Sequence, residues 1–169
     1  MINYPYLPPG REIKLVPADH PYMQAAKQAC RELSTDLFHP TGAVVVLADQ
    51  IIAREGNQAA LQHPAWQAKH AAGWCVRRWL KIPSGQKYWL CPGCSTFRHH
   101  SESRAARTAV ATGLDLTQAE LYLWGHWWCC EPCWQAMIKA GIGSVYLMAG
   151  GEVLFNRSHP DHQIGKFDI

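Results

Sequence analysis

Two short stretches of the sequence combine residue types that could hold and use a metal ion, HSE at residues 100–102 and CEPC at residues 130–133. A catalytic zinc needs three protein ligands and one open position for water, and the imidazole of His100 with the thiolates of Cys130 and Cys133 would meet that need. Cysteines three residues apart on the first turn of a helix point the same way, and a helix N-terminus favours their thiolate forms. Glu102 would then lie beside the open position and could move protons without being a ligand.

A second pair of cysteines, Cys91 and Cys94, is separated by proline and glycine, which suit a tight loop that aims both sulfur atoms at one ion. Two further ligands are needed. Cys75 is the natural third, and His99 or His70 the fourth. This pattern predicts a structural zinc that fastens the middle of the chain, with His99 as the favoured fourth ligand. The alternative is that these cysteines are reduced and bind no metal.

The composition is that of an ordinary globular protein. The chain has 169 residues, 48% hydrophobic and 17% charged, which suits one domain with a single core. Its seven cysteines are an odd number, which argues against a fully paired disulfide framework and favours metal ligands in a reducing compartment. No apolar run approaches the roughly 20 residues of a membrane span, and the N-terminus does not resemble a secretory signal. We therefore expect a soluble, cytoplasmic protein.

The charge is unevenly distributed. The net charge is only +3, which does not favour nucleic-acid binding by the whole chain. Half of the sixteen Lys and Arg residues nevertheless lie between Lys69 and Arg107, where Glu102 is the only acid. Such a field favours an anionic partner, for instance a nucleotide phosphate. Alternatively, these cations are a solvated surface that offsets the charge of zinc-bound thiolates.

The elements that must position these motifs can be read from the periodicity of the apolar residues. Apolar positions three and four residues apart predict helices, and β-branched runs predict strands. The first twenty residues are rich in proline and read as an irregular lead-in. The later strands alternate with helices, which implies parallel pairing in a sheet covered by helices. The predicted elements are a helix at 22–37, a hairpin at 42–53, helices at 67–80 and 101–112, a strand at 120–124, a helix at 131–140, and strands at 144–148 and 153–155.

Together these motifs resemble the cytidine deaminase superfamily, whose signature is H-x-E followed by P-C-x-x-C. The sequence is most similar to the deoxycytidylate deaminase branch, and residues 41–57 (TGAVVVLADQIIAREGN) and 133–147 (CWQAMIKAGIGSVYL) share in the resemblance. It covers about residues 21–57 and 99–150. It implies an α/β, three-layer cytidine-deaminase-like fold with a central mixed five-stranded sheet covered by helices. Residues 1–169 would form a single domain with an inserted zinc-knuckle-like segment at about 58–98.

The resemblance also implies a site and a reaction. His100, Cys130 and Cys133 match the zinc ligands, and Glu102 matches the proton shuttle. Asn57 matches an asparagine that contacts the substrate's sugar. The implied reaction is hydrolysis at C4 of a cytosine ring, which converts a cytosine nucleotide, with dCMP favoured, to the uracil nucleotide and ammonia. Relatives are usually dimers or larger, so a homo-oligomer is expected.

Other positions are matched less directly. Gly42 and Ala43 match backbone that lines the base pocket, and Arg104, where the branch often has asparagine, could meet a phosphate. Cys129 stands where proline is usual and could compete with Cys130, although Cys130 keeps the spacing to Cys133. Ser101 stands where alanine is usual. The tryptophans at 124, 127 and 128 could stack on a base or fill the core.

Three other functions remain open. The chain could deaminate a base within tRNA or single-stranded DNA, for which a groove of arginines and aromatic residues would be the mark. It could act on another small amino-heterocycle. It could also be a non-catalytic, zinc-stabilised nucleic-acid-binding module, in which case both metals would be closed, four-ligand sites.

Overall fold

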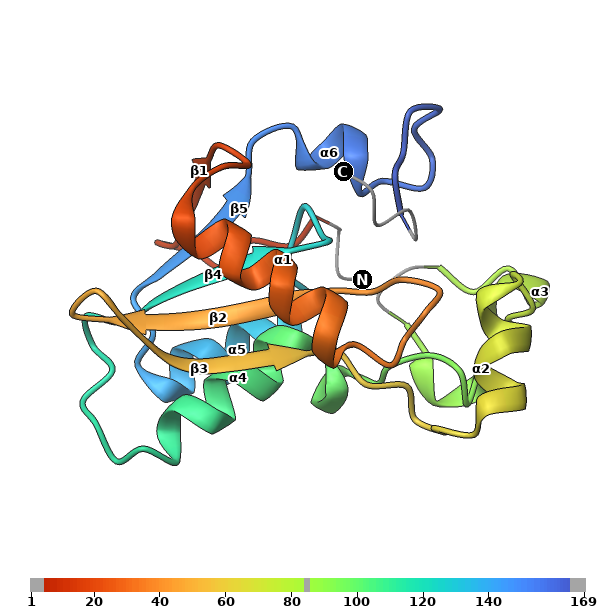
Figure 1. Cartoon of the computed structure of the whole chain (residues 1–169), viewed down its shortest axis with the longest axis horizontal. Coiled ribbons are helices and arrows are strands. Elements are labelled where there is room, and N and C mark those ends of the chain that lie inside the picture. Colours follow the sequence, from red (N-terminus) through yellow and green to blue (C-terminus); the bar gives the residue numbers. More distant parts are fainter. Residues whose placement is uncertain (1–4, 84–85, 165–169) are drawn as a thin grey trace.

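A mixed five-stranded sheet forms the centre of the protein in the computed structural model, which describes residues 5–83 and 86–164 (Figure 1). The strand order is β1-β5-β4-β2-β3. Strands β1, β5 and β4 run parallel to one another, whereas β2 is antiparallel to both β4 and β3. The fold is therefore α/β with the expected mixed sheet. The strands are β1 (Ile13–Val16), β2 (Gly42–Leu47), β3 (Gln50–Gly56), β4 (Glu120–Trp124) and β5 (Ser144–Met148).

Helices cover both faces of the sheet, which gives three layers (Figure 1). Helix α1 lies across one face, α4 and α5 lie on the other, and α2 and α3 lie beyond one end of the sheet. Among the described residues, no helix combines the length and the apolar character that crossing a membrane requires. The α-helices are α1 (Pro21–Leu33), α2 (Pro64–Ala71), α3 (Val76–Trp79), α4 (Ser101–Val110), α5 (Glu131–Ala140) and α6 (Gly151–Leu154), and the 3-10 turns are η1 (Tyr88–Leu90) and η2 (Phe97–His99).

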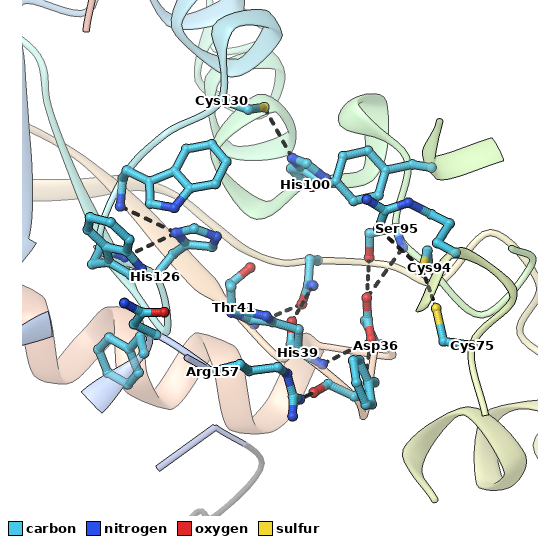
Figure 2. A pocket seen from close by; sticks show the side chains of 18 of the residues that line it. Asp36, His39, Thr41, Cys75, Cys94, Ser95, His100, His126, Cys130 and Arg157 are labelled. Carbon is cyan, nitrogen blue, oxygen red and sulfur yellow. Dashed lines mark hydrogen bonds between the residues drawn. The ribbon is translucent and has the colours of Figure 1, made fainter. Parts of the chain in front are cut away.

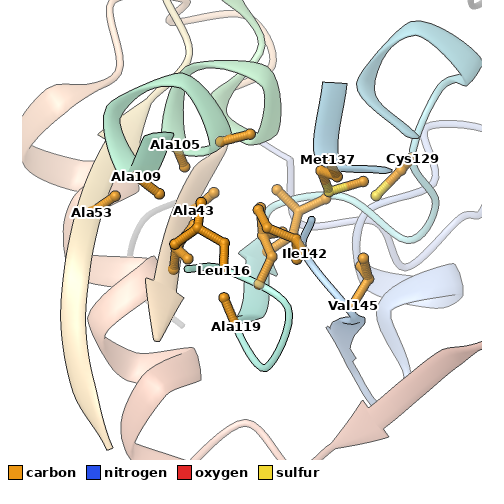
Figure 3. Packing of buried hydrophobic residues seen from close by; sticks show 14 of the residues in the cluster. Ala43, Ala53, Ala105, Ala109, Leu116, Ala119, Cys129, Met137, Ile142 and Val145 are labelled. Carbon is orange, nitrogen blue, oxygen red and sulfur yellow. The ribbon is translucent and has the colours of Figure 1, made fainter. Parts of the chain in front are cut away.

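Alternating side chains of β2 divide the core into two layers. Ala43 and Val45 pack with residues of α4 and α5, whereas Val44 and Val46 pack with α1. The α4 side contributes alanines, including the fully buried Ala105, so this helix can lie close to the strands (Figure 3). Helices α4 and α5 carry the HSE and CEPC motifs at their N-termini, so this tight packing positions both motifs.

The observed strands differ from the predicted ones in two places. Residues 13–16, expected in an irregular lead-in, form β1 and pair with β5. Residues 153–155, expected as a strand, instead belong to the end of α6. This helix begins after Gly150, whose φ is left-handed, and Phe155 is its C-cap. The physical reason is that β1 and β4 already occupy both edges of β5, which leaves no place for a further strand beside it.

The middle helix is also shorter than predicted. The expected helix at 67–80 is divided into α2 and α3 by a turn at Gly73, whose φ of 95° is left-handed. The helix expected at 22–37 ends at Leu33. Because these helices are shorter, the residues that follow α1 and α2 are in loops, and some of them line the cavity described below.

Candidate metal centre

The HSE and CEPC motifs meet where α4 and α5 begin. His100 and Cys130 are the residues immediately before these two helices, and Cys133 lies in the first turn of α5. The Nδ1 atom of His100 is 3.5 Å from Cys130 Sγ and 3.4 Å from Cys133 Sγ, and the two sulfur atoms are 3.3 Å apart. The structure thus brings the three predicted ligands together.

The two nitrogen–sulfur distances fit a zinc ion, whereas the two sulfur atoms would have to separate by about 0.5 Å to reach ideal tetrahedral spacing. Tetrahedral zinc with its usual bond lengths places sulfur about 3.5 Å from nitrogen and about 3.8 Å from a second sulfur. The hydrogen bond between Cys130 and Cys133 and the neighbouring His100 lower the pKa of the Cys130 thiol to about 5, so a thiolate is present at neutral pH. The chemistry of the donors, one imidazole and two thiols on converging helix N-termini, suits zinc better than a hard cation. Cys129 is fully buried in the core and belongs to no metal-ligand group of the described residues.

Glu102 lies beside this group, in the first turn of α4. Its side chain is only 5% exposed, and burial raises the pKa of its carboxyl group. Ser101 Oγ donates a hydrogen bond to Glu102 Oε2 at 3.2 Å and lies 2.8 Å from Thr41 Oγ1, which holds the carboxylate in place. A carboxyl group with a raised pKa can both accept and return a proton near neutral pH.

A cavity of about 430 Å³ opens beside the metal ligands (Figure 2). Its size lies within the range of about 300–1,000 Å³ that is typical of small-molecule sites. His100, Cys130 and Glu102 line it, and so do Trp127 and Trp128. Its walls come mainly from the loops at 36–41, 94–95, 126–128 and 155–158 and from the segment at 75–82, which includes α3.

Stacked rings form one wall of the cavity. His39 and His126 are parallel, with ring centroids 5.1 Å apart, and Trp128 meets His126 edge-on at 4.7 Å. His126 Nδ1 accepts hydrogen bonds from the backbone N–H groups of Trp127 and Trp128, at 3.0 and 3.3 Å. Burial lowers the pKa of both histidines, so the rings are neutral at physiological pH. Trp124, in contrast, packs in the core beside α1.

Asn57 lines the cavity as expected, but its side chain also organises the cavity wall. Its Oδ1 accepts hydrogen bonds from the Thr41 backbone N–H at 2.9 Å and from Ser34 Oγ at 2.6 Å. Its Nδ2 donates to the His39 carbonyl oxygen at 2.9 Å. Asn57 therefore ties the loop at 34–41 to the end of β3.

Three other predicted substrate residues lie elsewhere. Gly42 packs against α1, and Ala43 is buried under α4, so Thr41 is the residue of this segment that lines the cavity. Arg104 donates two hydrogen bonds to Glu55 Oε2, at 3.0 and 2.5 Å, and does not line the cavity. Residue 104 lies about 200° around the helix from residue 102, so it faces β3 when Glu102 faces the cavity.

The second cysteine group is closed and buried. His70, Cys75, Cys91 and Cys94 place their ligand atoms within 4.8 Å of one another. Cys94 Sγ is 3.6 Å from both Cys75 Sγ and His70 Nε2. A hydrogen bond from Cys94 lowers the pKa of the Cys75 thiol to about 3, so this group too offers a thiolate. Four buried nitrogen and sulfur donors are typical of a structural zinc site.

His70, not His99, completes this group. Nδ1 of His99 pairs instead with Thr96 Oγ1 at 3.0 Å, at the 3-10 turn that precedes α4, and His99 is not a member of the cysteine group. His70 reaches them from α2, with Nδ1 3.8 Å from Asp36 Oδ1. Carboxylates commonly orient metal-binding histidines in this way. Asp36 was not anticipated, because a single acid in a loop gives no pattern in the sequence.

Both groups border one cavity, since Cys75, Cys94 and His70 line it together with His100 and Cys130. The family model described as the cytidine and deoxycytidylate deaminase zinc-binding region matches residues 17–149, which include every residue of both groups. No protein with a curated description matches the chain significantly.

Proposed function

Because the chain belongs to the cytidine and deoxycytidylate deaminase family, we propose that it is a zinc-dependent hydrolytic deaminase that converts dCMP to dUMP and ammonia. One observation carries the proposal: a buried carboxylate, Glu102, shares a cavity with a metal-ligand group that has three members among the residues that the structure describes. Three ligands leave a fourth position open, as catalytic zinc requires.

His100, Cys130 and Cys133 would hold the ion at one end of the cavity. When bound there, zinc supplies a Lewis acid that lowers the pKa of water to near neutrality. Glu102 would pass one proton of the attacking water to the ring nitrogen, and then a second proton, from the hydroxyl group that the water leaves on C4, to the departing amine. Its burial serves this role, because a raised pKa brings the carboxyl group closer to the pH at which it must both accept and donate.

The remaining walls would hold the substrate. The neutral rings of His126 and Trp128 offer a surface on which a pyrimidine can stack. Because His126 Nδ1 accepts backbone hydrogen bonds, its proton lies on Nε2, which can serve as a donor. Asn57 stays the proposed sugar contact, at the edge of the same cavity.

The second zinc would be structural. Its four protein ligands leave no open position, and all four come from the segment at about 58–98 that we propose as an insert. Through Asp36, which accepts hydrogen bonds from the Ser95 backbone N–H at 3.3 Å and Ser95 Oγ at 3.1 Å, this site supports the loop that carries His39 and Thr41. The zinc would therefore stabilise the cavity without taking part in the reaction.

A non-catalytic binding module is less well supported. A binding module needs two closed metal sites, whereas the His100 group has three members within the described parts of the chain and borders a cavity that also contains Glu102.

The experiment that tests the proposal is ammonia release by zinc-loaded protein from dCMP, CMP, deoxycytidine, cytidine and short single-stranded oligonucleotides. Release from dCMP that is abolished by removal of zinc and restored by its return would support the proposal. Release from oligonucleotides alone would move the substrate to nucleic acid. No release from any of them by folded, zinc-loaded protein would overturn the assignment to cytosine substrates.

A further inference from the structure

Three arginines line the cavity beside the second metal group: Arg77 and Arg78 in α3, and Arg157 after α6. The guanidinium of Arg77 is already hydrogen-bonded within the protein. Its guanidinium donates to the carbonyl oxygens of Gln86 and Pro83, both at 2.8 Å, and to Cys94 Sγ at 3.9 Å. Its role is therefore to hold the second metal group and the chain around it, which leaves the other two arginines to be explained.

Arg78 and Arg157 converge on a single ring. The guanidinium carbon of Arg157 is 3.8 Å from the centroid of the Phe38 ring, and that of Arg78 is 5.4 Å from it. Arg157 also donates a hydrogen bond to the Phe38 carbonyl oxygen. Both side chains are exposed at the edge of the cavity, and Figure 2 shows Arg157 on the far side of the pocket from Cys130.

No carboxylate pairs with either cation within the described parts of the chain. Asp36 attracts Arg157 at longer range, but its carboxylate is already engaged by Ser95 and lies beside His70. Partial desolvation against the cavity wall lowers the pKa of the Arg157 guanidinium, and the charge of Arg78 lowers it further. Two cations thus repel each other at the cavity wall, and an anion between them would relieve the repulsion.

We propose that Arg78 and Arg157 bind the 5′-phosphate of the substrate nucleotide, while its base lies beside Glu102. This inference rests on the proposed function, since it takes the cavity to be the substrate site. Guanidinium groups suit phosphate because their fork of donors matches its oxygen atoms. The two cations border the same small-molecule-sized cavity as the metal ligands, so one mononucleotide can reach both. Arg157 lies outside residues 17–149, so the family match does not assign it.

The test compares dCMP with deoxycytidine in steady-state kinetics of the zinc-loaded wild type, Arg78→Gln and Arg157→Gln. Arg98→Gln is the matched control, because Arg98 is an exposed arginine that does not line the cavity. Loss of one charged hydrogen-bonding partner should raise KM for dCMP by roughly tenfold to a hundredfold. KM for deoxycytidine should change by less than about twofold, because the nucleoside has no phosphate for the arginines to bind. The control should match the wild type on both substrates.

Binding of dUMP, followed by quenching of tryptophan fluorescence, separates this inference from the proposed function. If no substrate is deaminated but Arg78→Gln weakens dUMP binding and not deoxyuridine binding, the deaminase proposal fails and the phosphate site stands. If dCMP and deoxycytidine are deaminated equally well and neither variant matters, the deaminase stands and the phosphate site is refuted. If the variants weaken binding of an oligonucleotide but not of dUMP, the mononucleotide site is likewise refuted.

Discussion

Gly93→Ala tests whether His70 is a metal ligand. A methyl group at this position would lie 2.4 Å from Cγ, 2.5 Å from Cδ2 and 2.8 Å from Cβ of His70. Carbon atoms pack at about 3.5–4.0 Å, so the buried ring must move by roughly 1 Å. Metal–ligand distances tolerate only about 0.2 Å, so the displaced ring would no longer complete the group.

We expect Gly93→Ala to retain one zinc per chain where the wild type retains two, after dialysis against a mild chelator and measurement by mass spectrometry. The overpacking should also lower the free energy of unfolding by about 1–3 kcal/mol, in addition to the lost metal. Gly151→Ala is the matched control, because its added methyl group would meet Phe155 and Trp127 at an ordinary 3.5 Å. Two tightly held zinc ions in Gly93→Ala would refute the assignment of His70.

Three further predictions concern residues around the cavity. Arg104→Ala should leave KM for the substrate unchanged and lower the free energy of unfolding by about 1 kcal/mol, because Arg104 pairs with Glu55 and not with a phosphate; a large rise in KM would contradict this. Gly42→Ala should destabilise the protein by about 3 kcal/mol in urea unfolding, because its methyl group would lie 2.2 Å from the Ala26 carbonyl oxygen; unchanged stability would show that α1 lies farther from β2. The pKa of His39, followed by NMR, should be about 4, because burial and the charge of Arg157 oppose protonation. Its contribution to stability is therefore present above pH 6.5 and is lost as the pH falls through 4, whereas titration near 6.5 would place the ring in solvent.

The motifs that could be predicted from the sequence are local ones. Cys130 and Cys133 lie three residues apart at a helix start, so their convergence follows from helix geometry alone. His100 and Glu102 are fixed in the same way by α4. The alternation of strands and helices in the second half of the chain likewise predicts the parallel pairing of β4 and β5.

The features that could not be predicted depend on contacts between distant segments. β1 is only four residues long and follows several prolines, so its own sequence pattern does not predict a strand. Its strand structure depends on pairing with β5. Asp36 and Arg157 reach the cavity from loops, where no periodicity marks a side chain that faces inward. The choice between His70 and His99 depends on how α2 folds back over the cysteines.

The most direct test of the central claim is kcat of Glu102→Gln with its zinc content measured in the same sample. The amide keeps the shape of the side chain but cannot take up the proton, so kcat for ammonia release from dCMP should fall by about 10²–10⁴-fold while zinc stays bound. Glu131→Gln, which changes another acid at a helix start but outside the cavity, should be as active as the wild type. A Glu102→Gln protein that holds its zinc and deaminates dCMP at the wild-type rate would contradict the role assigned to this carboxylate.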